Sequence, residues 1–242
     1  MKPNVPILLS IFLFLSACNA YRTTPDSEIL FTKKDLTKNG FIVAPVIDVS
    51  PKSANTVADL NAYDSILTNT LKSLWPSTSL MSTSEITQNL EGEDEEIEGW
   101  RGALVKEDQN QKQKSASNSS PSSVEITRKL IRFGSNPPKQ VLLASVLQNS
   151  VSCGQKEVLA TYLSPDPKGF KGYCQRIMKM RFRILDVQKN TFVWNGIIYA
   201  TQESTQPSPA ARSEEDNPLE PPSTQSLIRD CFTNFARQFS EN

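Results

Sequence analysis

The stretch "IMKMRFRILDVQKNTFVWNGIIYATQ", residues 177–202, decides the fold. Its first half alternates between apolar and basic side chains, and the polar turn "QKN" separates it from a second half that begins at Thr191. Alternation with a period of two is typical of a strand, and two such runs joined by a short turn predict an antiparallel β-hairpin. The apolar set of the first strand is Met178, Met180, Phe182 and Ile184, the basic set is Lys179, Arg181 and Arg183, and the second strand carries Phe192, Trp194 and Gly196 on one face.

Further strands precede the hairpin. "GFIVAPVIDVS", from Gly40, is a continuous apolar run, which predicts a strand covered on both faces. "TSLMS", residues 78–82, predicts a short strand. "KQVLLASVLQNSV" (139–151) and "EVLATYLS" (157–164) predict two separate strands, and 124–138 predicts a short helix or an irregular stretch.

Helical patterns flank these strands. Apolar residues between 60 and 74 recur every three or four positions, which predicts an amphipathic helix that ends before Pro76. A shorter helix is expected from Thr83 or Ser84 to Leu90. The last helix starts from a Ser223 or Thr224 cap. Its apolar face should dock on the sheet and consists of Leu227, Ile228, Cys231, Phe232, Phe235 and Phe239.

This order predicts one α/β domain, residues 39–242, with a mixed sheet flanked by helices. Two polar, low-complexity segments near 106–123 and 203–223 have too few apolar residues to offset the entropy of ordering, so we expect disordered insertions there. The acidic run "EGEDEEIE", residues 91–98, lacks the ligand spacing of known calcium loops and is interpreted as a solvated face or loop.

The amino terminus predicts export. Val5 to Leu15 is an apolar run too short to span a bilayer, as expected of a signal peptide. The Leu15-Ser16-Ala17-Cys18 sequence that follows resembles the bacterial lipobox.

The lipobox resemblance implies cleavage between Ala17 and Cys18, acylation of Cys18 and anchoring of the protein in a membrane. Ordinary cleavage after Ala20, or an uncleaved anchor, are the alternatives. Residues 1–17 would be the signal peptide and 18–38 a flexible tether. An Asp directly after the lipidated cysteine would resemble an inner-membrane retention signal, but this position is Asn19. Sorting to the outer membrane, facing the periplasm, is therefore expected.

Composition excludes several classes of function. The 26 basic residues balance the 26 acidic residues, so no net field favours nucleic acid. The chain has no histidine, which removes Ser-His-Asp and Cys-His arrangements and histidine-ligated zinc. We expect no enzyme activity, no cofactor and no metal, although a glycosidase-like carboxylate pair stays open because folding, not spacing, sets such pairs.

Three cysteines remain besides Cys18. Cys153 and Cys174 could form a disulfide in an oxidising periplasm, or they could be two buried thiols. Cys231 lies on the apolar face of the last helix, where a free, inert thiol is expected.

The strands at "GFIVAPVIDVS", "VLLASVL" and "MRFRILDVQKNTFVWNG" resemble a domain of envelope lipoproteins, the curli-exporter and TolB amino-terminal-like group, which is similar to peptidoglycan-synthase activators. The resemblance implies a non-catalytic accessory protein that binds a periplasmic or outer-membrane partner. The polar insertions are unlike the membrane-spanning hairpins of pore-forming members. The basic row Lys179, Arg181 and Arg183 is the candidate binding site, with a solvated face or pairing to neighbouring acids as the alternative. A structural lipoprotein that binds cell-wall polymer or assembles with its own copies is the second hypothesis.

Overall fold

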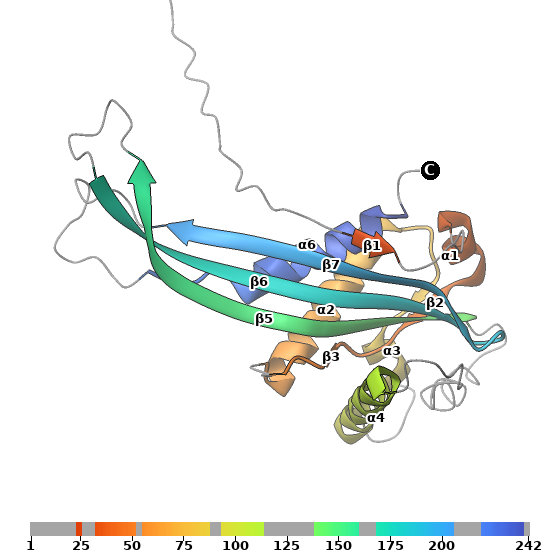
Figure 1. Cartoon of the computed structure of the whole chain (residues 1–242). Helices are drawn as coiled ribbons and strands as arrows, with labels where there is room; N and C mark the ends of the chain where they lie inside the picture. The colour runs from red at the N-terminus through yellow and green to blue at the C-terminus, as the bar shows by residue number, and fades with distance from the viewer. Residues whose placement is uncertain are drawn as a thin grey trace, which may run out of the picture.

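A computed structural model describes residues 23–25, 32–51, 55–87, 93–113, 138–159, 168–205 and 219–239. The described strands are β1 (Thr23–Pro25), β2 (Phe41–Val43), β3 (Ile47–Asp48), β4 (Leu80–Met81), β5 (Gln140–Leu159), β6 (Lys168–Asp186) and β7 (Thr191–Thr205). The described helices are α1 (Lys33–Asn39), α2 (Val57–Leu74), α3 (Thr83–Thr87), α4 (Glu93–Gln113) and α6 (Thr224–Arg237). They form one α/β domain with a mixed sheet (Figure 1).

The predicted hairpin is confirmed as β6 and β7, but Phe192 and Trp194 lie on opposite faces instead of sharing one, because the register shifts between Ile184 and Leu185. The sheet order is β1-β7-β6-β5-β2-β4, with β3 also paired to β5. β6 pairs antiparallel with β5 and β7, whereas β2 and β3 pair parallel with β5. β5 therefore joins the antiparallel and parallel parts of the sheet.

Two strand predictions need correction. The strands expected at 139–151 and 157–164 are joined in one strand, β5, because β6 pairs with it without interruption from Gln140 to Leu159 apart from one bulge at Val146/Gln148. Residues 160–164 lie outside the described residues. The single strand expected from Gly40 is split into β2 and β3 around Pro45. Proline has no N–H to donate, and the Val46 N–H donates to the Asp64 side chain at 2.6 Å instead of joining the ladder.

One face of the sheet packs against α2 and α6, as the helical patterns predict. Phe182 of β6 stacks on Phe235 of α6 at 4.5 Å between ring centroids, and Trp194 of β7 meets Phe235 edge-on at 5.3 Å. The indole N–H of Trp75 donates to the Ala236 carbonyl at 3.2 Å, which joins the end of α2 to α6. The docking of the carboxy-terminal helix on the sheet is thus confirmed.

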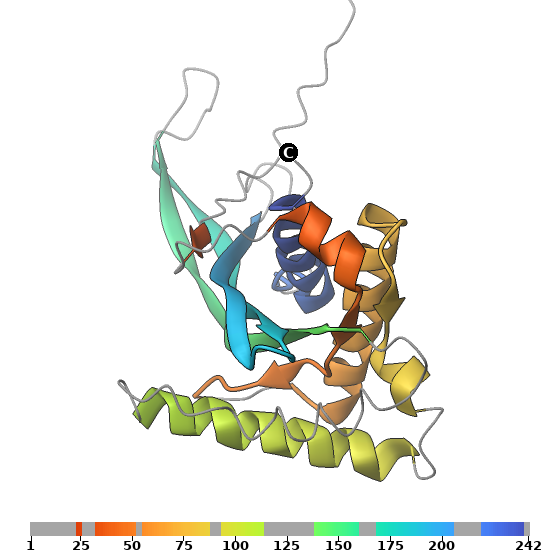
Figure 2. The same cartoon turned by 90° about the vertical axis from the view of Figure 1, so that its right-hand side faces the viewer.

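The opposite face is covered at one end by α3 and α4. Figure 2 shows α4 and α6 on opposite sides of the sheet. A second apolar cluster lies beneath α4, and it includes Ile42, Ile47, Ile86, Trp100, Leu104, Val141, Leu143 and Leu185. Strand β2 is buried on both faces, as its continuous apolar sequence predicts.

The tether prediction for residues 18–38 is partly wrong. Residues 23–25 form β1, which pairs with Gly196 to Ile198 of β7, and α1 begins at Lys33. Asp35 accepts bonds from the N–H and hydroxyl of Thr32, a capping box that starts the helix, and Leu36 is buried in the core. The signal peptide and Cys18 lie outside the described residues.

The two insertions are also shorter than predicted. Residues 93–98 of the acidic run begin α4, where Glu98 is exposed, which agrees with a solvated face. The helix continues through residues 106–113 because Trp100, Leu104 and Asp108 are buried against the sheet. β7 continues to Thr205, and the main chain at 219–223 is described. The remainder of both insertions lies outside the described residues. So do residues 88–92, where the helix predicted to reach Leu90 would end, and residues 124–137.

Gly196 leaves room for Trp194 on the same strand. A Cβ atom at Gly196 would lie 2.5 Å from the Trp194 ring, which is itself held between Phe235 and Phe239. We expect Gly196→Ala to lower the free energy of unfolding by about 1–3 kcal/mol, measured by urea denaturation. Gly102→Ala, in α4 with open space around the new Cβ, is the matched control and should be neutral or stabilising. Equal losses in both variants would contradict this packing.

Candidate functional site

The predicted basic row is not a free surface, because α4 lies against two of its three members. The Asp108 carboxylate of α4 is fully buried and accepts from Arg181 at 3.2 Å and from Arg183 at 3.1 Å. The alternative reading of the sequence, pairing with neighbouring acids, therefore holds for Arg181 and Arg183. This corrects the prediction that the whole row binds a partner.

Burial dominates the electrostatics of Arg183. Its side chain is 6% exposed, and the loss of solvation lowers the pKa of the guanidinium, an effect that Asp108 opposes. The Arg183 guanidinium also lies over the Phe192 ring at 5.0 Å. Arg183 and Asp108 thus fasten the second half of α4 to the sheet.

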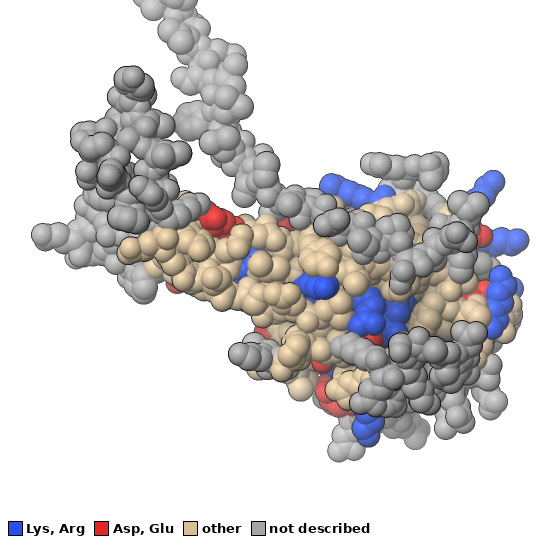
Figure 3. Space-filling model, viewed as in Figure 1, with Lys and Arg blue, Asp and Glu red and all other residues tan. Residues whose placement is uncertain are grey.

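Lys179 is the member of the row that α4 does not pair. It lies opposite Tyr199 on β7, with its ammonium 4.9 Å from the centroid of the tyrosine ring. Ile177 and Ile197 occupy neighbouring positions on the same face of the sheet. We call the four residues Ile177, Lys179, Ile197 and Tyr199 the outer face. In Figure 3, uncharged residues cover most of the described sheet surface, with a few basic side chains among them.

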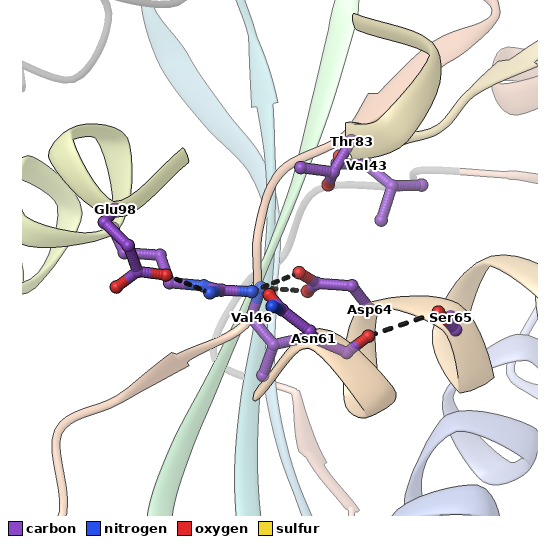
Figure 4. A network of polar contacts seen from close by, with 8 residues as sticks. Val43, Val46, Asn61, Asp64, Ser65, Thr83 and Glu98 are labelled. Atoms are coloured by element: carbon purple, nitrogen blue, oxygen red, sulfur yellow. Dashed lines mark hydrogen bonds and ion pairs between the residues drawn. The ribbon is translucent and has the colours of Figure 1, made fainter. Parts of the chain in front are cut away.

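A second buried ion pair ties α4 to α2. Arg101 of α4 contacts Asp64 of α2 and Glu98 one turn away, and its side chain is 4% exposed (Figure 4). Asp64 also accepts the Val46 N–H. Burial raises the pKa of Asp64 to about 6, even though the Val46 N–H and Arg101 favour the charged form.

A cleft of about 480 Å³ opens beside this ion pair, between β3, α2 and α4. Its lining mixes Ile47, Leu60 and Val105 with the polar groups of Asp48, Arg101 and Lys106. A carboxyl group with a pKa near 6 at a cleft could act as a general base. Here both oxygens of Asp64 already accept hydrogen bonds, so the geometry favours a structural clamp.

The sequence left open that Arg181 and Arg183 pair with acids, but it identified neither Asp108 as their partner nor the pair between Asp64 and Arg101. Asp108 lies in a segment that composition assigned to an insertion, and Asp64 and Arg101 are 37 positions apart on two helices. The only sequence signal was the spacing of Trp100, Leu104 and Asp108, which places them on one face of a helix.

The structure joins Cys153 of β5 to Cys174 of β6 in a disulfide, one of the two alternatives left by the sequence. Cys231 is buried on α6, and burial raises the pKa of its thiol, as expected of an inert cysteine. Within the described ranges there is no cluster of three potential metal ligands, and no helix there is long and apolar enough to cross a membrane.

Comparisons with known proteins found distant structural likenesses. No protein-family profile matches the chain, and no curated protein sequence matches it. The PelC dodecamer from Paraburkholderia phytofirmans is 12% identical, with 89% of this chain and 94% of that chain covered and a TM-score of 0.39. Lipoprotein GNA1162 from Neisseria meningitidis is 12% identical, with 84% and 99% covered and a TM-score of 0.37. A putative neuraminyllactose-binding hemagglutinin homolog from Helicobacter pylori is 8% identical, with 89% and 90% covered and a TM-score of 0.40. At these scores the likenesses carry no argument about function.

Asp108 should be essential for stability. We expect Asp108→Ala to lower the free energy of unfolding by about 3 kcal/mol or more, because it removes the buried carboxylate that the guanidiniums of the buried Arg183 and the partly buried Arg181 contact. The control is Lys72→Ala, which breaks an ion pair to Glu85 whose side chains are 48% and 46% exposed. That variant should lose less than about 1 kcal/mol. Similar small losses for both variants in urea denaturation would contradict this role of Asp108.

Asp64 should titrate near pH 6. A carboxyl whose pKa is raised on folding binds more protons in the native than in the unfolded state between about pH 4 and 6. Its contribution to stability is therefore greatest below pH 4 and falls as the pH rises to 6, by roughly 3 kcal/mol in total. Carbon-13 NMR of the side-chain carboxyl should report the midpoint, and Asp64→Asn should lose this part of the pH dependence. A midpoint near 4 would contradict the raised pKa.

Proposed function

We propose that the protein is a lipid-anchored envelope protein that acts as a non-catalytic binding module for a periplasmic or outer-membrane protein in envelope assembly or secretion. Cys18 carries the acyl chains, and the domain faces the periplasm from the outer membrane. The Leu15-Ser16-Ala17-Cys18 sequence supports the anchor. The disulfide between Cys153 and Cys174 supports an oxidising compartment.

The observation that carries the binding role is the outer face. Lys179 and Tyr199 lie beside Ile177 and Ile197 on the part of the sheet that begins next to Arg181, where the ion pairs of α4 end. Tyrosine is enriched in the cores of protein interfaces, where it offers a large apolar surface and a polar tip. Asp64 and Asp108, the buried carboxylates that could suggest catalysis, are both engaged by arginine, which favours binding over chemistry.

Cross-linking from the outer face tests this proposal. The full-length chain would carry a photoreactive benzophenone amino acid in place of Tyr199 and would be irradiated in intact cells. We expect one dominant envelope protein to be captured and identified by mass spectrometry. The matched control carries the same probe at Val57, a 51% exposed position at the start of α2, and should not capture that protein.

A second control tests the anchor in the same cells. Cys18→Ser should abolish palmitate incorporation, and the capture from position 199 should fall when the chain is no longer held at the membrane. Persistent palmitate label would contradict the lipid anchor. Capture of cell-wall fragments or only of further copies of the chain would contradict the accessory role and favour the structural hypothesis.

A further inference from the structure

One edge of β5 has no described partner over much of its length. β3 pairs with β5 only at Ser145 and Val146, and the last bond on this side is donated by the Val49 N–H to the Val146 carbonyl at 3.0 Å. From there to Leu159, no strand in the described part of the chain pairs with this edge, while β6 pairs with the other edge throughout.

The disulfide shows which main-chain groups point toward the open edge. The Cα atoms of Cys153 and Cys174 are 4.1 Å apart, which is the close spacing of a pair that exchanges no main-chain hydrogen bonds. The N–H and C=O of Cys153 therefore point away from β6. Because the pattern alternates along a strand, the same holds for Val151 and Asn149. Three evenly spaced residues thus present donors and acceptors on this edge.

This edge lacks the features that usually prevent strand pairing. From Leu147 to Gln155, this edge contains no charged residue and no proline, and the charged residues Lys156 and Glu157 follow. Natural edge strands are commonly protected by charge, proline or short length. The terminal strands of the sheet have such protection, since β1 has three residues and ends in Pro25, and β4 has two, while the part of β7 that extends beyond β1 carries Glu203. Val151, on the open edge, is 42% exposed.

We infer that the open edge of β5, from Leu147 to Gln155, pairs with the same edge of a second copy of this chain, antiparallel about a two-fold axis at Val151, with residues 156–159 of each copy turning away where β3 of the other copy occupies the edge. Val151 then lies opposite its counterpart and Asn149 opposite Cys153 of the other copy, which forms about six main-chain hydrogen bonds. A two-fold interface uses one patch twice, so the patch must be complementary to itself. An uncharged edge with the sites at 149, 151 and 153 spaced symmetrically about its centre meets that condition.

The strand is already held in the conformation that pairing requires. The disulfide fixes Cys153, and the Asn149 side chain accepts from Arg176 at 3.0 Å and donates to Asn55 at 3.3 Å. Association therefore costs little further conformational entropy in this strand. This pairing is independent of the proposed function, which concerns the outer face and a different protein.

Site-specific cross-linking locates the pairing. The full-length chain, extracted in detergent, would carry the benzophenone probe at position 151, or at position 57 as the control. The expected product has twice the mass of the chain, and mass spectrometry should map the link to residues 140–155 of the second copy. Absence of this product at 151, or an equal yield from position 57, would overturn the inference. Loss of the partner capture at position 199 would leave it intact.

A charge swap tests the same contact in the dimer equilibrium. Val151→Lys and Val151→Glu each place like charges opposite one another and should raise the dimer dissociation constant at least about fivefold, measured by light scattering in detergent. An equal mixture of the two variants should restore association. Val57→Lys, the same change at an equally exposed valine, should have no effect. Unchanged dissociation constants for both position-151 variants, or no recovery in the mixture, would overturn the inference. Thermal unfolding of each variant separates loss of pairing from loss of the fold.

Discussion

The pairing of β6 with β5 on one side and β7 on the other is the constraint on which the rest of this structure depends. It places Met178, Met180, Phe182 and Ile184 on one face, where α2 and α6 pack, and Arg181 and Arg183 on the other, where α4 packs. A register shift of one residue would exchange the two faces, so that the arginines would meet Phe235 and the apolar residues would meet Asp108. The aromatic contacts of α6 and the ion pairs of α4 therefore select the same register from opposite sides.

α4 differs from the other long helices in how it is held. α6 presents a continuous apolar face with Phe232 and Phe235 at its centre. α4 buries Trp100 and Leu104 and adds two ionic contacts, Arg101 to Asp64 and Asp108 to the arginines of β6. Buried ion pairs add little net stability compared with apolar packing, but removal of one partner is costly. They fix the position of a helix whose sequence is too polar to be placed by hydrophobic burial alone.

Those two kinds of contact explain what could be predicted from the sequence. The hairpin, α2 and α6 were predicted because apolar residues at periods of 2 and 3.6, such as Phe182 and Phe235, carry the local pattern of their elements. α4 was missed because composition around Asp108 resembles a disordered segment, and its partners on β6 lie more than 70 positions away. The division at Pro45 and the continuity of β5 depend on which strands are neighbours, which local pattern does not encode. For the candidate site, the sequence placed Lys179, Arg181 and Arg183 correctly on one face of their strand. It did not predict that α4 covers this face and pairs with Arg181 and Arg183.

The sheet is closed by helices at one end and presents an outer face and an open edge beyond them. Residue-resolved amide hydrogen exchange of the full-length chain at low concentration tests this arrangement directly. Ser150 and Ser152, which pair with β6, should exchange slowly, whereas Asn149, Val151 and Cys153 should exchange fast and become protected as the concentration rises. Uniform protection of all five amides at every concentration would contradict an open edge. Uniformly fast exchange would contradict the β5–β6 ladder itself.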